Sequence, residues 1–278
     1  MRKTILNASL EESTNLVTDK YIQVSIEDIN KKGVKFKIFG FLTLLFFMYL
    51  LCLLGNMIDE LKVTFLFIKP SYITNFLLIL GFIPTALYFN SILKIRNNRI
   101  LAYYYYNIYV YLLLFCFGLQ TTLLFIAGSS VVLGPIFSTL IYGVLLACIL
   151  LERYNWFKQT TLKTLYGQEK IVNTQSDFME KFVSFSKKYG GIIIVLIFII
   201  RLLLPGQVKD NDFLRTLGMA FSPLMFLIGI YFTLSLATES IQGYYLKKYL
   251  EDYRQLSGYS LEEWYGPKSK KYRESLKK

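Results

Sequence analysis

The sequence predicts an all-α fold, a polytopic membrane helix bundle of about six transmembrane helices. Six long apolar runs carry almost none of the 50 charged residues (31 Lys and Arg, 19 Asp and Glu). Crossing a hydrocarbon core of about 30 Å takes about 20 apolar helical residues, and a backbone in lipid has to satisfy its own hydrogen bonds. The predicted spans cover residues 38–56, 72–93, 100–126, 129–151, 190–205 and 215–238.

The distribution of basic residues predicts the orientation of these spans. Alternate segments are basic: the four segments 1–37, 94–99, 152–189 and 239–278 hold 7, 3, 7 and 9 of the Lys and Arg residues. The intervening loops 57–71, 118–130 and 206–215 hold 2, 0 and 2. Cytoplasmic loops of membrane proteins carry this excess, so we expect both termini in the cytoplasm. Topology and membrane lipid then explain the net charge of +12 without a nucleic-acid partner.

The segment before the first span, residues 1–37, is expected to be a cytoplasmic tail. Two alternating stretches, Tyr21–Ile26 and Val34–Ile38, flank a turn-like run that ends at Gly33. This pattern predicts a β-hairpin over residues 21–39. The alternative is an amphipathic helix from Ile22 to Phe36 that lies on the membrane. The first apolar run begins near residue 38, so we expect a retained signal-anchor.

Between the first and second spans, residues 56–71 form a semi-polar segment on the predicted outer side. Asp59 and Glu60 are its two carboxylates and are candidates for contact with a partner. After the basic turn 94–99, four tyrosines occupy positions 103–106. Tyrosines next to a basic loop are typical of the aromatic belt at the lipid headgroups, and a stacking surface for a ligand is the alternative.

Small residues mark the junction of the third and fourth spans. Residues 127–130, Ala-Gly-Ser-Ser, are uncharged and predict a short turn. The predicted fourth span then carries Ser130, Gly134 and Ser138 on one helix at i, i+4 and i+8, with Gly143 beyond them. Small residues at that spacing let two helix backbones approach closely. They indicate either packing inside one bundle or a seam between two copies of the chain, so a homo-oligomer is possible.

The cytoplasmic segments contain two further signals. Residues 176–183 predict a capped amphipathic helix within the 152–189 loop. The region 239–278 predicts a basic helical tail in which Ser260 and Glu263 form a capping box. Trp264 and Tyr265 follow this box and are the candidate docking residues for a soluble partner. Folding of the two rings back on the 152–189 loop is the alternative.

The residues that usually carry chemistry are scarce. The chain has no histidine, and its three cysteines lie inside apolar runs without ligand spacing. No Asp or Glu lies in the middle of a span, so we expect neither an enzyme nor a cofactor or metal. Arg201 is the one ionisable residue well inside a span, where it either snorkels to the headgroups or contacts a pore or partner. Gln120, in the third span, is a further candidate for a pore or partner contact, and bonding to neighbouring helices is the alternative.

The chain resembles a family of small polytopic membrane proteins. The resemblance rests on the β-like stretch Lys20–Phe39, the Phe- and Ile-rich spans, and the exit Gly243-Tyr-Tyr-Leu-Lys-Lys-Tyr249. These features look like the immunity proteins encoded beside secreted toxins in low-GC Gram-positive bacteria. The resemblance implies a non-enzymatic protein of the bacterial inner membrane that binds a protein partner, the toxin, in or at the bilayer. The alternative function is a six-span permease that works with a separate ATPase.

Overall fold

The structure is a computed structural model that describes residues 4–60, 64–65, 67–95, 98–167, 213–267 and 269–277. The chain divides into two compact units. The first comprises Met1–Lys170 and Ala220–Lys278, and the second comprises Ile171–Met219. Of the second unit only residues 213–219 belong to the described part, so the contacts discussed below are those of the first unit.

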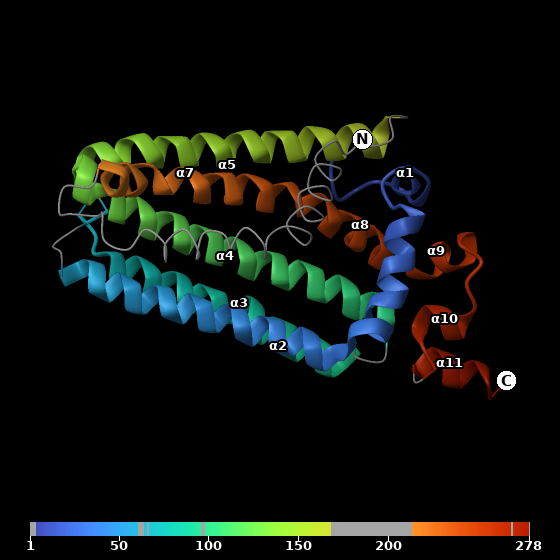
Figure 1. Cartoon of the computed structure of the whole chain (residues 1–278). Helices are drawn as coiled ribbons and strands as arrows, with labels where there is room; N and C mark the ends of the chain where they lie inside the picture. Colours follow the sequence, from blue (N-terminus) through green and yellow to red (C-terminus); the bar gives the residue numbers. More distant parts are fainter. Residues whose placement is uncertain are drawn as a thin grey trace, which may run out of the picture. The chain divides into compact units, whose positions relative to one another are not determined.

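The described chain is helical (Figure 1). Ten helices follow one another in the described ranges: α1 (Leu10–Thr14), α2 (Asp19–Glu60), α3 (Pro70–Ile95), α4 (Arg99–Leu133), α5 (Pro135–Tyr166), α7 (Phe213–Ser235), α8 (Ala237–Lys248), α9 (Leu250–Leu256), α10 (Leu261–Tyr265) and α11 (Lys270–Ser275). No strand forms in these ranges, where Phe65 and Ile68 make an isolated β-bridge. The predicted all-α class is confirmed.

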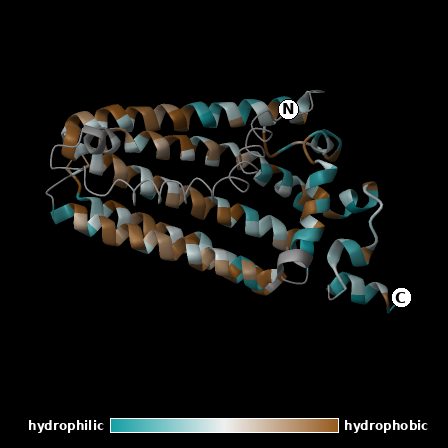
Figure 2. Ribbon diagram, viewed as in Figure 1, coloured by the Kyte–Doolittle hydropathy of each residue, from teal (hydrophilic) through white to brown (hydrophobic). Residues whose placement is uncertain are grey.

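Five helical stretches in the described ranges are long and apolar enough to cross a membrane: Gly33–Glu60, Pro70–Leu93, Arg99–Leu133, Pro135–Tyr166 and Gly218–Lys248. Three of them contain the predicted spans 38–56, 72–93 and 100–126, and Gly218–Lys248 contains most of 215–238. The predicted span 129–151 begins too early, because residues 129–133 still belong to α4 and the fourth stretch starts at Pro135. The remaining predicted span, 190–205, lies outside the described residues. Figure 2 shows the apolar residues along α2 to α5 and the hydrophilic ones in α9 to α11. Many large apolar side chains of the long helices are exposed, as expected of a multi-pass membrane protein.

The β-hairpin predicted for residues 21–39 is wrong. The segment belongs to α2, which starts at Asp19 and is interrupted at Gly33, where the backbone has φ 67° and ψ 161°. Glycine adopts a positive φ without the clash that a Cβ would cause. The turn signal was therefore placed correctly, but it separates two helical segments instead of two strands. The N-terminal segment is an amphipathic helix with Tyr21, Ile22 and Ile26 inside. It differs from the predicted alternative because it is interrupted at Gly33 and packs on the chain itself, where Tyr21 meets Tyr103.

The turn predicted at residues 127–130 also lies elsewhere. Helix α4 continues through these residues to Leu133, and the chain reverses at Gly134, where φ is 80°. Ser129 and Ser130 each donate a hydroxyl hydrogen bond to a carbonyl one turn back, which keeps them compatible with a helix. Pro135 then starts α5 at its first position, where its missing N–H costs nothing.

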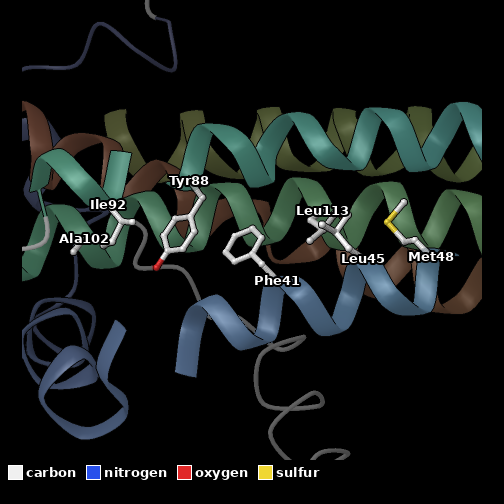
Figure 3. Packing of buried hydrophobic residues seen from close by; sticks show 7 residues of the cluster. All are labelled: Phe41, Leu45, Met48, Tyr88, Ile92, Ala102 and Leu113. Carbon is white, nitrogen blue, oxygen red and sulfur yellow. The ribbon is translucent and has the colours of Figure 1, made fainter. Parts of the chain in front are cut away.

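Helices α2, α3 and α4 share one core (Figure 3). Phe41 of α2 stacks on Tyr88 of α3 with 4.5 Å between ring centroids, and Tyr106 of α4 meets both rings edge to face. The other buried members of this cluster are Leu45, Met48, Ile92, Ala102 and Leu113. Bulky residues of α2 can pack this closely because Gly81 of α3 lies against the end of Met48. The cluster fixes the three helices side by side.

A second core joins α4, α5 and α7. Its buried residues are Ile126, Tyr142, Leu146, Leu227 and Ile230. Tyr142 donates a hydrogen bond of 2.5 Å to the Ala220 carbonyl, and Arg153, farther along α5, contacts Ser235, farther along α7. Residue numbers rise together along these two helices, so α5 and α7 run in the same direction.

Gly243 tests how closely α8 packs on its neighbours. A Cβ at this position would lie 2.5 Å from a ring carbon of Tyr104 and 2.6 Å from the hydroxyl oxygen of Tyr21. We expect Gly243→Ala to lower the free energy of unfolding by about 1–3 kcal/mol, because α4 and α2 would both have to move away from α8 to make room for the added methyl group. The measurement is unfolding of the purified protein in mild detergent.

The matched control is Gly229→Ala in α7, where a Cβ would meet nothing within 4 Å. Alanine is the better helix former, so this variant should be as stable as the parent chain or slightly more stable. Equal loss of stability in both variants would show that the close α8 contact is not what Gly243 provides.

Candidate functional site

The candidate functional site is the loop between α2 and α3, at the end of the bundle that the charge pattern predicts to lie outside. Four apolar side chains are exposed here: Met57 in the last turn of α2, Phe67 and Ile68 in the loop, and Tyr72 in the first turn of α3. Phe67 stands out because its exposed fraction is 91%. These four residues are called the aromatic tip below.

Three contacts hold the aromatic tip in place. Phe65 and Ile68 exchange two backbone hydrogen bonds of 3.0 Å, which close a tight turn under Phe67. Phe65 itself packs against the core of α4, α5 and α7. The Asp59 carboxylate accepts hydrogen bonds from Ser71, at 3.2 Å from the backbone N–H and 2.5 Å from the hydroxyl. Phe67 is thus displayed next to described residues that are held by hydrogen bonds and packing.

The two predicted partner carboxylates therefore differ. Asp59, at the end of α2, serves the start of α3: it satisfies a free N–H group of the first turn and places a negative charge at the positive end of the helix dipole. This carboxylate has a structural role. Glu60 is exposed beside it and is the carboxylate that a partner can reach.

Gln120 joins three helices, which is the second of its two predicted roles. Its side chain is fully buried in α4, and its amide nitrogen donates to the Met48 carbonyl of α2 and the Thr74 carbonyl of α3, both at 3.0 Å. The sulfur of Cys52 lies 3.4 Å from the same nitrogen. The Met48 and Thr74 carbonyls lie inside helices and already accept a backbone hydrogen bond there, so the Gln120 amide gives each of these carbonyls a second hydrogen bond. The residue holds the bundle together below the aromatic tip.

The small residues predicted to form one stripe lie on two helices. Ser130 belongs to α4, Gly134 is the turn, and Ser138 and Gly143 belong to α5. Ser138 faces Ser129 across the turn: their hydroxyl oxygens are 2.5 Å apart, and Ser138 also donates to the Ile126 carbonyl at 2.7 Å. These serines pack α4 against α5 inside one chain, and the single-helix seam at i, i+4 and i+8 is wrong.

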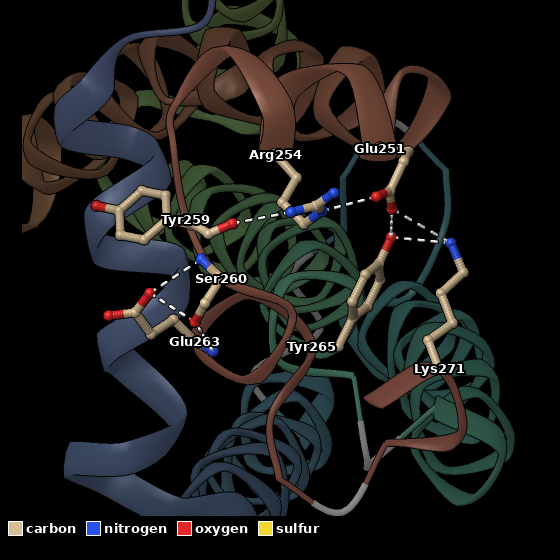
Figure 4. Close-up of polar contacts among 7 residues, drawn as sticks. All are labelled: Glu251, Arg254, Tyr259, Ser260, Glu263, Tyr265 and Lys271. Atoms are coloured by element: carbon tan, nitrogen blue, oxygen red, sulfur yellow. Dashed lines mark hydrogen bonds and ion pairs between the residues drawn. The ribbon is translucent and has the colours of Figure 1, made fainter. Parts of the chain in front are cut away.

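Trp264 and Tyr265 are buried, with exposed fractions of 0% and 1%. Figure 4 shows the polar contacts around Tyr265. The Tyr265 hydroxyl donates to the Glu251 carboxylate at 2.5 Å and accepts from Lys271 at 2.9 Å. Helix α10 also lies against α4, where Arg99 donates to the Glu263 carbonyl at 3.3 Å. Both rings are occupied by contacts within the chain. They do not form an exposed docking spot, because both are buried within the chain, where α10 lies against α4. The loop alternative falls mostly on residues 168–189, which lie outside the described residues.

The contacts in Figure 4 also shift ionisation. Burial raises the pKa of the Glu251 carboxyl, but the Tyr265 hydroxyl and the Arg254 and Lys271 charges outweigh burial and hold it below its ordinary value. Burial is also the main reason that the pKa of Tyr265 is raised. Glu251 therefore stays charged and joins α9 to α10 and α11 at neutral pH.

Three cations at the opposite end of the bundle lie over aromatic rings. Lys37 forms an ion pair with Asp28 and lies 4.2 Å from the ring centroid of Tyr106. Arg153 lies 4.0 Å from the Tyr231 centroid, and Lys247 donates to the Tyr105 hydroxyl at 2.7 Å. Rings of the 103–106 cluster thus face the chain's own cations, which favours the belt over a stacking surface for a ligand.

Sequence reasoning missed two kinds of residue here. Lys37 and Arg153 are almost fully buried, although both were counted among the charges of cytoplasmic segments. Phe67 was included in the semi-polar outer segment without a role of its own, and its exposure depends on the turn that Phe65 and Ile68 close. Arg201 and the amphipathic segment 176–183 lie outside the described residues.

The exposed residues of the aromatic tip and Glu60 form a surface that another molecule can contact. Among the described residues no group of three or more His, Cys, Asp or Glu could hold a metal ion. Comparison of this sequence with protein-family models, with curated proteins and with solved structures finds no match. The aromatic tip, with Glu60 beside it, is the described feature best suited to binding another molecule.

Gln120 gives a direct test of the three-helix contact. Gln120→Leu removes the bonds to Met48 and Thr74, and we expect it to lower the free energy of unfolding by about 1–2 kcal/mol, since side-chain hydrogen bonds between membrane helices contribute about 0.6 kcal/mol each on average. Thr121→Val is the control, because Thr121 bonds only to Phe117 of its own helix. A loss no larger for Gln120→Leu than for the control would contradict the assignment.

Proposed function

We propose that this chain is a non-enzymatic, multi-pass membrane protein that binds a protein partner at its outer face, with immunity to a secreted toxin as the favoured case. The observation that carries the proposal is the aromatic tip. A large apolar side chain that stands beside a hydrogen-bonded turn favours binding, because less conformational entropy is lost when a partner covers it.

The proposal includes a topology of six spans with both termini inside. Helices α5 and α7 run in the same direction, so a chain that alternates across the bilayer needs one further crossing between them. The basic residues Lys37, Arg99, Arg153 and Lys247 gather at one end of the described helices, and the aromatic tip lies at the other. The positive-inside tendency then puts the tip outside, where a secreted protein reaches it.

The interior of the described helices supports a binding role more than a transport role. Gln120, Ser129 and Ser138 are buried polar residues in the spans, and each is used in contacts between or within helices. A permease would instead use such groups to line a path for its substrate. The apolar exposed faces of the long helices fit contact with lipid or with a membrane-inserted partner.

Phe67→Ala tests the proposal. Burying a Phe side chain contributes about 1.5–3 kcal/mol, so the variant should bind the partner roughly ten- to a hundredfold more weakly. The tagged protein is purified from native membranes in mild detergent, bound proteins are identified by mass spectrometry, and cells that carry each variant are challenged with the protein recovered. Parent cells should survive, and Phe67→Ala cells should be sensitive.

Phe76→Ala is the matched control, because Phe76 is an exposed phenylalanine farther along α3. It should retain both the partner and protection, at the same level of protein in the membrane. Equal protection by Phe67→Ala and the parent chain would contradict the proposed site. Recovery of a nucleotide-binding subunit in place of a secreted protein would contradict the binding role and favour the permease.

A further inference from the structure

A second binding arrangement lies at the other end of the bundle and does not depend on the proposed function. Residues 4–18, called the strap below, run along the end of α5 and along α8 and α9 (Figure 1). The strap comprises a short turn followed by α1, whose first turn has a capping box between Ser9 and Glu12. It joins α2 at Asp19.

Five side chains of the helices hold the first part of the strap through its main chain. They are Tyr166, Tyr244, Tyr245, Lys248 and Tyr249, called the tyrosine cradle below. The shortest bonds run from the Tyr245 hydroxyl to the Ile5 carbonyl at 2.6 Å and from the Tyr166 hydroxyl to the Thr4 carbonyl at 2.8 Å.

The cradle also contacts the carbonyls of the next residues. Leu6 accepts from Tyr244 at 3.4 Å and from Lys248 at 3.3 Å. Ala8 accepts from Tyr249 at 2.9 Å and from Lys248 at 3.2 Å. In return the Ala8 N–H donates to the Tyr245 hydroxyl at 3.1 Å. All these hydrogen bonds involve backbone atoms of the strap, so they do not depend on which side chains the strap carries.

Side-chain selection comes from a few buried positions. Ala8, Ser13 and Leu16 are fully or almost fully buried, and the Ser13 hydroxyl lies 2.7 Å from the hydroxyl of Tyr253. Leu6, in contrast, is half exposed. A segment that fits the cradle therefore needs a small residue that carries an N–H, a serine five residues later and a leucine eight residues later, around a capped helical turn.

We propose that the tyrosine cradle is a polypeptide-binding site, which this chain fills with its own strap and which accepts a segment of the same pattern from another polypeptide. A tethered segment acts at an effective concentration on the order of millimolar. The strap thus excludes weak ligands, and a second polypeptide gains access when the strap is released. The partner class is defined by its backbone and by the Ala8, Ser13 and Leu16 positions.

The test uses a variant that lacks residues 2–17, purified in detergent, and a fluorescent synthetic peptide of residues 1–18. Fluorescence anisotropy should show saturable binding to the shortened protein and at least tenfold weaker binding to the full chain, whose cradle is filled. An Ala8→Pro peptide loses the N–H that Tyr245 accepts and adds bulk at a buried position, so it should bind at least tenfold more weakly. A Leu6→Ala peptide should bind like the parent peptide.

A second design covers the case in which the shortened protein does not fold. A protease site is inserted between Val17 and Thr18 of the full chain, and the strap is cut after folding. The cut strap should stay bound and exchange with the labelled peptide, and Tyr245→Phe should speed its release. A folded protein that ignores the peptide, or that binds the Ala8→Pro peptide equally well, would overturn the proposal.

Discussion

A solvent that offers no hydrogen bonds is the constraint on which this structure depends. Within the long helices each polar side chain has to find its partner in the protein, because lipid supplies none. The Gln120 amide nitrogen meets that requirement by donating to two neighbouring helices at once, and Ser138 does so across the Gly134 turn. The Gln120 carbonyl oxygen and the Thr122 hydroxyl are exceptions, because they are buried without a hydrogen-bond partner among the described residues. The bonds of Gln120 and Ser138 determine which helices are neighbours, and the apolar clusters around Phe41 and Tyr142 fill the space between them.

Charge follows the same constraint at the ends of the helices. Lys37, Arg153 and Lys247 keep their charges next to carboxylates, hydroxyls or aromatic faces. Burying a charge without such partners would be costly, and aromatic rings provide a partner that is itself compatible with the membrane interface. The strap and α9 to α11 then cover this polar end, whereas the opposite end displays Phe67. The two ends of one bundle thus have different chemistry, which is what a protein with separate inner and outer contacts requires.

The sequence predicted the parts of the fold that depend on blocks of apolar residues. Five spans lie where those blocks lie, and Gln120 bonds to its neighbours, which is one of its two predicted roles. Errors arose where one local pattern fits two structures. Alternation around Gly33 fits both a hairpin and an amphipathic helix, and burial of Tyr21 and Ile22 against other helices decides between them. Ser129 and Ser130 resemble a turn until their hydroxyls bond to their own helix.

Residues of the candidate site were harder to predict because exposure is a property of the whole fold. Trp264 looked like a surface anchor, but it is fully buried and its ring lies against that of Tyr259. Phe67 looked ordinary among apolar neighbours, but the Phe65–Ile68 bridge turns it away from them. Neither outcome can be read from spacing, since both depend on contacts between segments far apart or on the closure of one specific turn.

The orientation of the two ends is the central claim, and labelling of single cysteines in intact cells tests it most directly. The Phe67→Cys and Leu276→Cys variants are treated with a membrane-impermeant maleimide, with the unsubstituted chain as background for its own three cysteines. Both positions are exposed in the structure. The account predicts that the Phe67→Cys variant reacts in intact cells and that the Leu276→Cys variant reacts only after permeabilisation. The reverse pattern would place the aromatic tip inside and contradict the account.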